Sequence, residues 1–172
     1  MFIEKDQMEA HEYIKQTRAY LDYLEEHIEN IRKAFQEVSL ACDGMAWVGD
    51  DRTWFDTRHE ITLHDVSKFS KEEFTQYRGK FFSTKAELHD TQELDMNFDK
   101  AWTNHQAKNH HHWETAETET DIIHLVVDWT AMGYKFGDTA EEYYQNNIHD
   151  INIPKQHQKF LQTLFKKIKE AL

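Results

Sequence analysis

An apolar stripe at helical spacing near the N-terminus constrains the fold more than any other feature. From about Glu9 to Cys42 it contains Ile14, Leu21, Leu24, Ile28, Ile31, Phe35 and Val38. Intervals of this kind place apolar side chains on one face of an α-helix. His27 lies three residues after Leu24 and four before Ile31, so it shares that face. The spacing predicts one long amphipathic helix that turns a histidine toward the interior.

Residues that break helices are scarce in the rest of the chain. Among 172 residues there are only 5 glycines and 1 proline, and both types are unfavourable inside helices. Their scarcity favours long helices with few sharp turns over a β-sandwich or barrel. Hydrophobic residues make up 39% of the chain, which is enough for one core. We therefore expect a single all-α domain over residues 1–172.

Apolar spacing and local start signals predict the other helices. Ser70 and Glu73 in "SKEE" have the form of a capping box. Gly137 is a stop signal, and Pro154 suits the first turn of a last helix. Residues 43–56 and 83–93 are predicted to be irregular. The expected helices cover about 57–66, 70–82, 94–108 and 118–136, a short stretch from 138, and the segment after Pro154.

Composition also limits the compartment and the partners. The single cysteine, Cys42, allows no internal disulfide and suits a reducing cytoplasm. We see no signal peptide and no apolar run long enough to span a membrane, so we expect a cytoplasmic protein. A formal net charge of -12 disfavours binding to a long nucleic acid. A small anionic substrate remains compatible with this negative charge, because a bound metal ion can reverse the electrostatic field around it.

His64 and Asp65 stand side by side in the otherwise apolar run "ITLHDVSKFS". On a packed helix at least one of them would be partly buried, where an unpaired charge is costly. His27, His105 and Asp128 also face inward on their predicted helices. Imidazole and carboxylate ligands suit zinc, iron, manganese or nickel, and separate helices often supply them in a bundle core. The alternative is a buried hydrogen-bond network without a metal.

Each of these residues also has an ordinary structural explanation. A single histidine on an apolar stripe, such as His27, is more often a core residue than a ligand. Asp128 could cap a helix or pair with a lysine, and "NHHHW" could be a solvated turn. Lys68 could be a surface lysine near a helix C-terminus. Taken together, the inward imidazoles and carboxylates favour a metal, because several separate coincidences would otherwise be required.

The ordered pattern of His27, His64 with Asp65, and Asp128 resembles the signature of the HD-domain superfamily of metal-dependent phosphohydrolases. "HDVSK" resembles its extended motif, in which a lysine, here Lys68, follows three residues after the aspartate. "HDVSKFSKEEF", "AWTNHQAKNHHHWE" and "VVDWTAMG" are similar to a small uncharacterised HD-like family of bacteria and their phages. The likeness spans residues 20–140. It implies an HD-domain-like helical bundle with the metal site in its core.

The resemblance implies a first metal site. One divalent metal, Mn, Fe, Zn, Ni or Mg, would be bound by His27, His64, Asp65 and Asp128. In this role Asp65 would also be a catalytic residue. If a phage encodes the protein, the compartment would be the host cytoplasm.

The resemblance to binuclear members implies a second metal site. Asp65 would bridge to a second ion held by His105, His111 and His112. The sequence does not decide which of His110, His111 and His112 are ligands. No glycine-rich "GYP"-type segment follows the histidine pair, which departs from the cyclic-dinucleotide phosphodiesterases of the superfamily.

The implied activity is hydrolysis of a small phosphoester, with a nucleotide favoured, through a metal-activated water. Lys68, with Arg78 or Lys108, would stabilise charge on the phosphate. One alternative is a di-iron oxygenase of the inositol-oxygenase-like branch. Another is a non-catalytic module that binds a nucleotide or a host protein, as in phage anti-defence. The amphipathic C-terminal segment, residues 158–172, could serve a homodimer as readily as a core.

Overall fold

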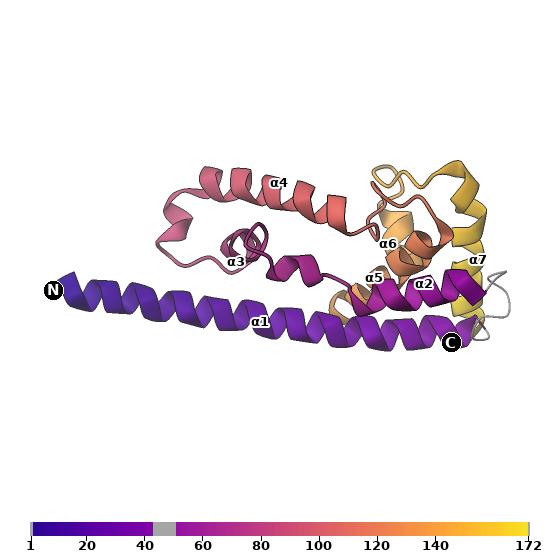
Figure 1. Ribbon diagram of the computed structural model, residues 1–172, viewed down its shortest axis with the longest axis horizontal. Coiled ribbons are helices and arrows are strands. Elements are labelled where there is room, and N and C mark those ends of the chain that lie inside the picture. The colour runs from indigo at the N-terminus through magenta and orange to yellow at the C-terminus, as the bar shows by residue number, and fades with distance from the viewer. Residues whose placement is uncertain (1, 43–50, 172) are drawn as a thin grey trace. The chain divides into compact units, whose positions relative to one another are not determined.

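The computed structural model describes residues 2–42 and 51–171, with side chains omitted at residues 2–5, 51, 52 and 54. The described residues form helices and no strand, which confirms the all-α prediction (Figure 1). None of these helices combines the length and apolar character that a membrane crossing needs. In chain order the elements are α1 (Phe2–Ala41), α2 (Asp51–Thr62), η1 (Val66–Phe69), α3 (Phe74–Phe81), η2 (Glu87–His89), α4 (Thr91–Lys108), α5 (Glu119–Phe136), α6 (Ala140–Asn146) and α7 (Lys155–Ala171), where η marks a 3₁₀ helix.

The chain divides into two compact units. The first unit contains Met1–Glu26 and Asp65–Lys108, and the second contains His27–His64 and Asn109–Leu172. Helix α1 therefore contributes its N-terminal part to the first unit and its C-terminal part to the second. The single domain over residues 1–172 stays a prediction.

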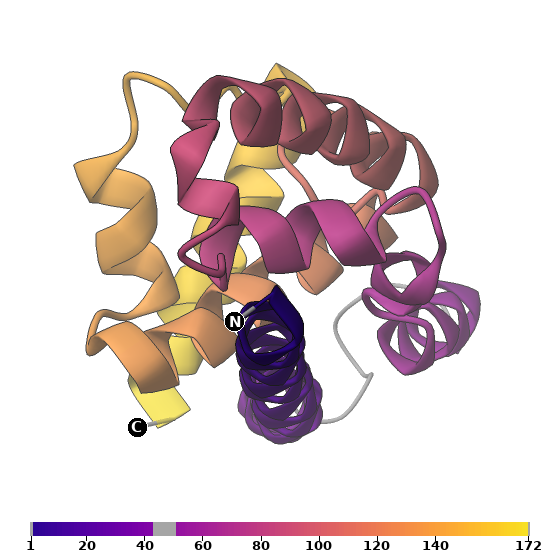
Figure 2. The same cartoon turned by 90° about the vertical axis from the view of Figure 1, so that its left-hand side faces the viewer.

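Helix α1 confirms the long helix expected between Glu9 and Cys42, and it begins earlier, at Phe2 (Figure 2, where α1 is seen nearly along its axis). Tyr20, Leu24, His27, Ile31, Ala34 and Val38 form its buried stripe. Ile14 and Leu21 were expected on this face, but they are 49% and 41% exposed. Tyr20 takes the inward position instead of Leu21, because the buried stripe repeats at alternating intervals of four and three residues.

In the first unit, α3 and α4 pack against each other and aromatic side chains form most of the core. Tyr20, Leu24, Tyr77 and Ala101 are buried there. Tyr77 meets Phe98 edge to face, with ring centroids 5.2 Å apart. This packing fixes α4, the helix that carries His105.

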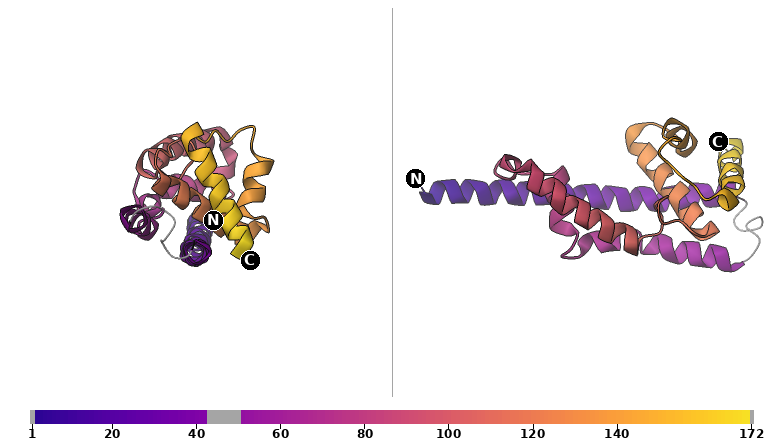
Figure 3. Two further views of the ribbon diagram at one scale, coloured as in Figure 1. Left: turned by 90° about the vertical axis from the view of Figure 1, so that its right-hand side faces the viewer. Right: turned by 90° about the horizontal axis from the view of Figure 1, so that it is seen from above.

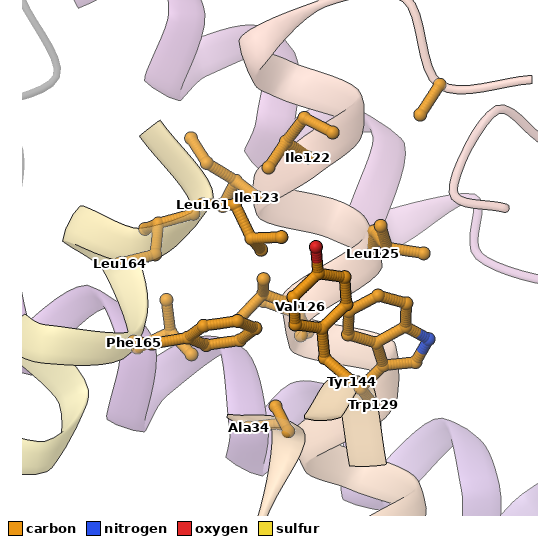
Figure 4. Packing of buried hydrophobic residues seen from close by; sticks show 14 of the residues in the cluster. Ala34, Ile122, Ile123, Leu125, Val126, Trp129, Tyr144, Leu161, Leu164 and Phe165 are labelled. Atoms are coloured by element: carbon orange, nitrogen blue, oxygen red, sulfur yellow. The ribbon is translucent and has the colours of Figure 1, made fainter. Parts of the chain in front are cut away.

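In the second unit, α5 lies at the centre, and α2, α6 and α7 all pack on it (Figure 3). Thr118 caps α5 in a capping box with Asp121, and Gly137 ends it in the left-handed conformation with φ 89°. Figure 4 shows the apolar side chains of α7, among them Leu164 and Phe165, directed toward α5. Because α5 is held on several sides, its polar residues have fixed positions.

The predicted boundaries of the second helix were wrong. We expected a loop up to residue 56 and a helix from Thr57 to Val66, whereas α2 runs from Asp51 to Thr62. Residues 43–50 of that expected loop lie outside the described part of the chain. The earlier helix end means that His64 and Asp65 follow α2 rather than belonging to it.

The start of the third helix also differs from the prediction. Helix α3 begins at Phe74, and the Glu73 side chain makes no cap hydrogen bond. The expected capping box with Ser70 is therefore absent, because the Glu73 carboxylate binds groups elsewhere in the first unit. The end of α4 at Lys108 and the stop of α5 at Gly137 are confirmed, as is the helix after Pro154.

Candidate metal centre

A sharp turn between α2 and η1 positions His64 and Asp65. Asp65 has φ 58° and ψ 10°, the left-handed conformation, which is uncommon for residues other than glycine. Its carbonyl accepts a hydrogen bond from the Lys68 backbone N–H at 2.9 Å, which begins η1. The prediction that both residues lie on one helix is wrong, because the left-handed residue interrupts the helical path.

Three predicted ligands converge in the second unit. His27 Nε2 lies 2.9 Å from His64 Nε2 and 3.3 Å from Asp128 Oδ1. His64 Nε2 lies 3.7 Å from the same Asp128 oxygen. Donor atoms that bind one ion at about 2.0–2.2 Å are separated from each other by about 3–3.5 Å. The separations of 2.9, 3.3 and 3.7 Å lie within about 0.2 Å of this range, so the three atoms are close to the mutual spacing of ligands around a single ion.

The electrostatics of Asp128 fit a ligand role. Burial alone would raise the pKa of its carboxyl group. The hydrogen bond with His27 and the charges of His64, His27 and His111 outweigh burial and hold that pKa well below its usual range. Asp128 is thus an anionic carboxylate at neutral pH, which is the form that binds a metal.

A second group of histidines surrounds the other edge of the His64 ring. His64 Nδ1 lies 2.8 Å from His124 Nε2. The His111 ring is centred 4.3 Å from that of His64 and 4.5 Å from that of His124. Each of the three residues offers one nitrogen within 4.8 Å of the others, and all three are buried. Of the neighbouring histidines, His112 is half-buried and His110 is exposed.

Sequence reasoning missed His124. It lies four residues before Asp128 on α5, so the two side chains share one face of the helix. The spacing in "HLVVD" was the available signal. The surrounding α5 sequence is strongly apolar, and the histidine was assigned neither to the core nor to the site.

The first unit holds a chain of polar contacts that begins at Asp65. Asp65 Oδ2 accepts from Lys68 Nζ at 2.6 Å, and Asp65 Oδ1 lies 3.2 Å from His105 Nε2. The other nitrogen of this ring, His105 Nδ1, lies 2.8 Å from Glu73 Oε2. The fully buried His105 imidazole is therefore placed between two carboxylates.

Glu73 anchors this chain of contacts, and it too was missed as a site residue. Its carboxylate accepts from Ser67 Oγ at 2.8 Å and from Asn104 Nδ2 at 2.6 Å, in addition to its contact with His105. A carboxylate behind an imidazole is the usual partner that orients a metal-binding histidine. Glu73 and His105 are 32 residues apart, so no local pattern could join them.

The predicted ligands thus fall into groups. His27, His64 and Asp128 are brought together, and His111 lies beside His64 in the same unit. Asp65 contacts His105 in the first unit. The role of Asp65 as the fourth ligand of the first metal stays a prediction. The second metal site, formed by Asp65 with His105, His111 and His112, also stays a prediction.

The three basic residues predicted to stabilise negative charge on the phosphate of the substrate have different surroundings. Arg78 is 1% exposed, and its guanidinium is paired with Glu87, which favours a structural role. Lys108 is exposed at the end of α4. Lys68 is largely buried and contacts Asp65, so it is the one of the three that lies beside a predicted ligand.

Comparisons with known proteins identify the family to which the chain belongs. A search of curated proteins found no match, and a search of solved structures found none either. A family model matches residues 16–172, which is nearly the whole chain. The chain therefore belongs to the family described as "Family of unknown function (DUF5662)".

Proposed function

We propose that this protein is a metal-dependent phosphohydrolase that acts on a small phosphoester, with a nucleotide as the favoured substrate. The observation that carries the proposal is the convergence of His27 Nε2, His64 Nε2 and Asp128 Oδ1 within 3.7 Å of one another. These residues come from α1, from the turn after α2 and from α5. Buried polar groups from such distant segments need a shared partner, and a cation provides one.

The donor set fits a divalent first-row ion. Two imidazoles and one carboxylate suit manganese, iron, zinc or nickel better than magnesium, which prefers oxygen ligands. When bound, such an ion polarises a phosphoryl oxygen and lowers the pKa of a coordinated water. The anionic state of Asp128 supports this assignment, because protonation would remove its donor oxygen.

Lys68 and Asp65 are the chain's own candidates for handling the phosphate. Asp65 follows the ligand His64 directly in the sequence, and the HD-like motif continues to Lys68. The Lys68 ammonium is held by Asp65 at 2.6 Å and lies 5.2 Å from the centre of the Tyr77 ring. A cation fixed in this way can stabilise negative charge that grows on a phosphoryl group without first being ordered.

The strong negative charge of the chain also supports a cation-dependent site. At a formal net charge of -12, the protein as a whole repels phosphates. A buried divalent ion reverses this field locally, where the substrate would bind. Without the ion we expect no phosphoester binding.

A di-iron oxygenase is the second candidate, and one observation favours it. Two histidines and one carboxylate, as in His27, His64 and Asp128, are also the facial ligand set that binds a single iron in mononuclear non-haem oxygenases, so the group suits one iron of the pair. The two candidate activities, phosphohydrolase and oxygenase, differ in whether turnover requires dioxygen. Phosphate release under anaerobic conditions supports the hydrolase, and turnover that requires ferrous iron and oxygen supports the oxygenase.

The test is phosphate release from a panel of nucleotides by metal-free protein reloaded with Mn²⁺ under anaerobic conditions. We expect turnover by the parent protein and loss of it in His27→Gln. His59→Gln is the matched control, because His59 is an exposed histidine on α2. Tight nucleotide binding without turnover by the metal-loaded parent would instead indicate a non-catalytic binding module.

A further inference from the structure

The two ring nitrogens of His64 face different partners within the second unit. Nε2 faces His27 and Asp128, at 2.9 and 3.7 Å. Nδ1 faces His124, at 2.8 Å. If Nε2 binds the ion of the proposed function, the opposite edge of the same ring still points into a group of imidazoles.

That group has the composition of a ligand set. His64, His111 and His124 are only 4%, 2% and 4% exposed, and each offers a nitrogen within 4.8 Å of the others. Three positively charged rings at such spacing would repel one another strongly in a buried place. If the rings are neutral, His111 and His124 each present a lone pair, and His64 presents one at Nδ1 once the proton on that nitrogen is displaced, so that one cation can bind all three.

We propose that His64 Nδ1, His111 and His124 hold a second metal ion, so that His64 is shared between two ions, one at each ring nitrogen. The inference rests on the proposed function, because it shares His64 with that metal centre. Binding of the second ion replaces the ring proton of His64, which is released to solvent. This assignment differs from the predicted second site, because it uses His64 and His124 in place of Asp65, His105 and His112.

The ligand chemistry favours zinc or copper(II). Three imidazoles with an open fourth position are a known set for zinc, and imidazole also suits copper. No carboxylate from this trio offsets the charge of the ion, so the ion can attract a further anionic group of the substrate. Ions on opposite nitrogens of one ring lie about 6 Å apart, too far to share one phosphoryl oxygen as closely spaced metal pairs do.

The first experiment is metal analysis of zinc-loaded protein after gel filtration. We expect about two zinc ions per chain in the parent and about one in His124→Gln, with His59→Gln unchanged. His27→Gln should retain one ion, and His64→Gln should weaken both sites. Far-UV circular dichroism of the metal-free variants checks that each one folds. The proposal is overturned if the parent binds one ion, or if a second ion survives in His124→Gln and is lost in His105→Gln.

A second measurement needs no variant. Two copper(II) ions joined through one imidazole ring couple their spins, which lowers the EPR signal below that of two independent ions. We expect this loss of signal when the parent protein takes up its second equivalent of copper. A full signal from both equivalents would show that His64 is not shared. Two bound ions without phosphate release would reject the proposed hydrolase activity and support the second metal site. Phosphate release with only one bound ion would support the hydrolase activity and reject the second metal site.

Discussion

His27 and His64 face each other through their Nε2 atoms at 2.9 Å, although 37 residues separate them in the sequence. Two imidazole nitrogens at this distance share either a proton or a cation. Asp128 Oδ1 lies 3.3 Å from His27 Nε2 and 3.7 Å from His64 Nε2, so a carboxylate completes the group. This oxygen supplies a third donor, which a metal ion uses and a proton shared by two nitrogens does not need, so the geometry favours the metal ion.

Asp128→Asn tests the charge of this ligand set. Asparagine keeps the shape of the side chain and removes its negative charge, so metal affinity should fall by at least about 100-fold. Competition with a chelator measures the affinity. Asp150→Asn, at an exposed position, is the control and should leave the affinity unchanged. Equal affinity of Asp128→Asn and the parent would remove Asp128 from the site.

Lys68→Ala tests the proposed stabilisation of phosphate charge. The protein should keep its metal, because His27, His64 and Asp128 are intact, while kcat/KM for phosphate release falls by about 100-fold. Lys71→Ala replaces an exposed lysine nearby and should change neither quantity. Full turnover by Lys68→Ala would assign Lys68 to a structural role.

Glu73→Gln tests the buried contacts of the first unit. The carboxylate accepts from Ser67 and Asn104 and contacts His105, and an amide cannot accept at both of its ends. We expect the free energy of unfolding in urea to fall by about 1–3 kcal/mol. Glu72→Gln changes a neighbouring exposed carboxylate and should have little effect. Similar unfolding curves for both variants would contradict the anchoring role of Glu73.

The Arg78–Glu87 ion pair predicts how stability depends on pH. The hydrogen bond from Arg78 lowers the pKa of Glu87 to about 2. A lowered carboxyl pKa stabilises the folded state above the unfolded-state value, near pH 4.5, and this contribution is lost as the pH falls toward 2. At pH 7, Glu87→Gln should therefore cost about 1–2 kcal/mol, because Glu87 is only partly buried. Denaturant unfolding of parent and variant from pH 7 to pH 2 should show the two curves converging, and a constant difference would contradict the assignment.

Periodicity predicted the helices because their apolar faces are set by local spacing. The buried stripe of α1 and the cap of α5 at Thr118 both follow from residues within a few positions of one another. The turn at Asp65 was not predicted, because nothing in "LHDVS" distinguishes a left-handed aspartate from a helical one. The backbone conformation of Asp65 is determined by tertiary packing rather than by neighbouring residues in the sequence.

The candidate site was predictable to the extent that its residues form an ordered pattern. His27, His64 and Asp128 were each identified from an apolar context or from the HD-like motif, and they are found together. Glu73 was assigned to a cap because the local pattern "SKEE" fits one, while its actual partners lie far away in the sequence. Contacts between distant polar residues depend on tertiary packing, which spacing along one helix does not encode.

Anomalous X-ray diffraction from crystals of the zinc- or manganese-loaded protein can locate an ion among His27, His64 and Asp128. We expect a peak about 2.0–2.2 Å from His27 Nε2, His64 Nε2 and Asp128 Oδ1. A metal-loaded crystal with no peak among these three atoms, or with their side chains directed away from one another, would contradict this expectation.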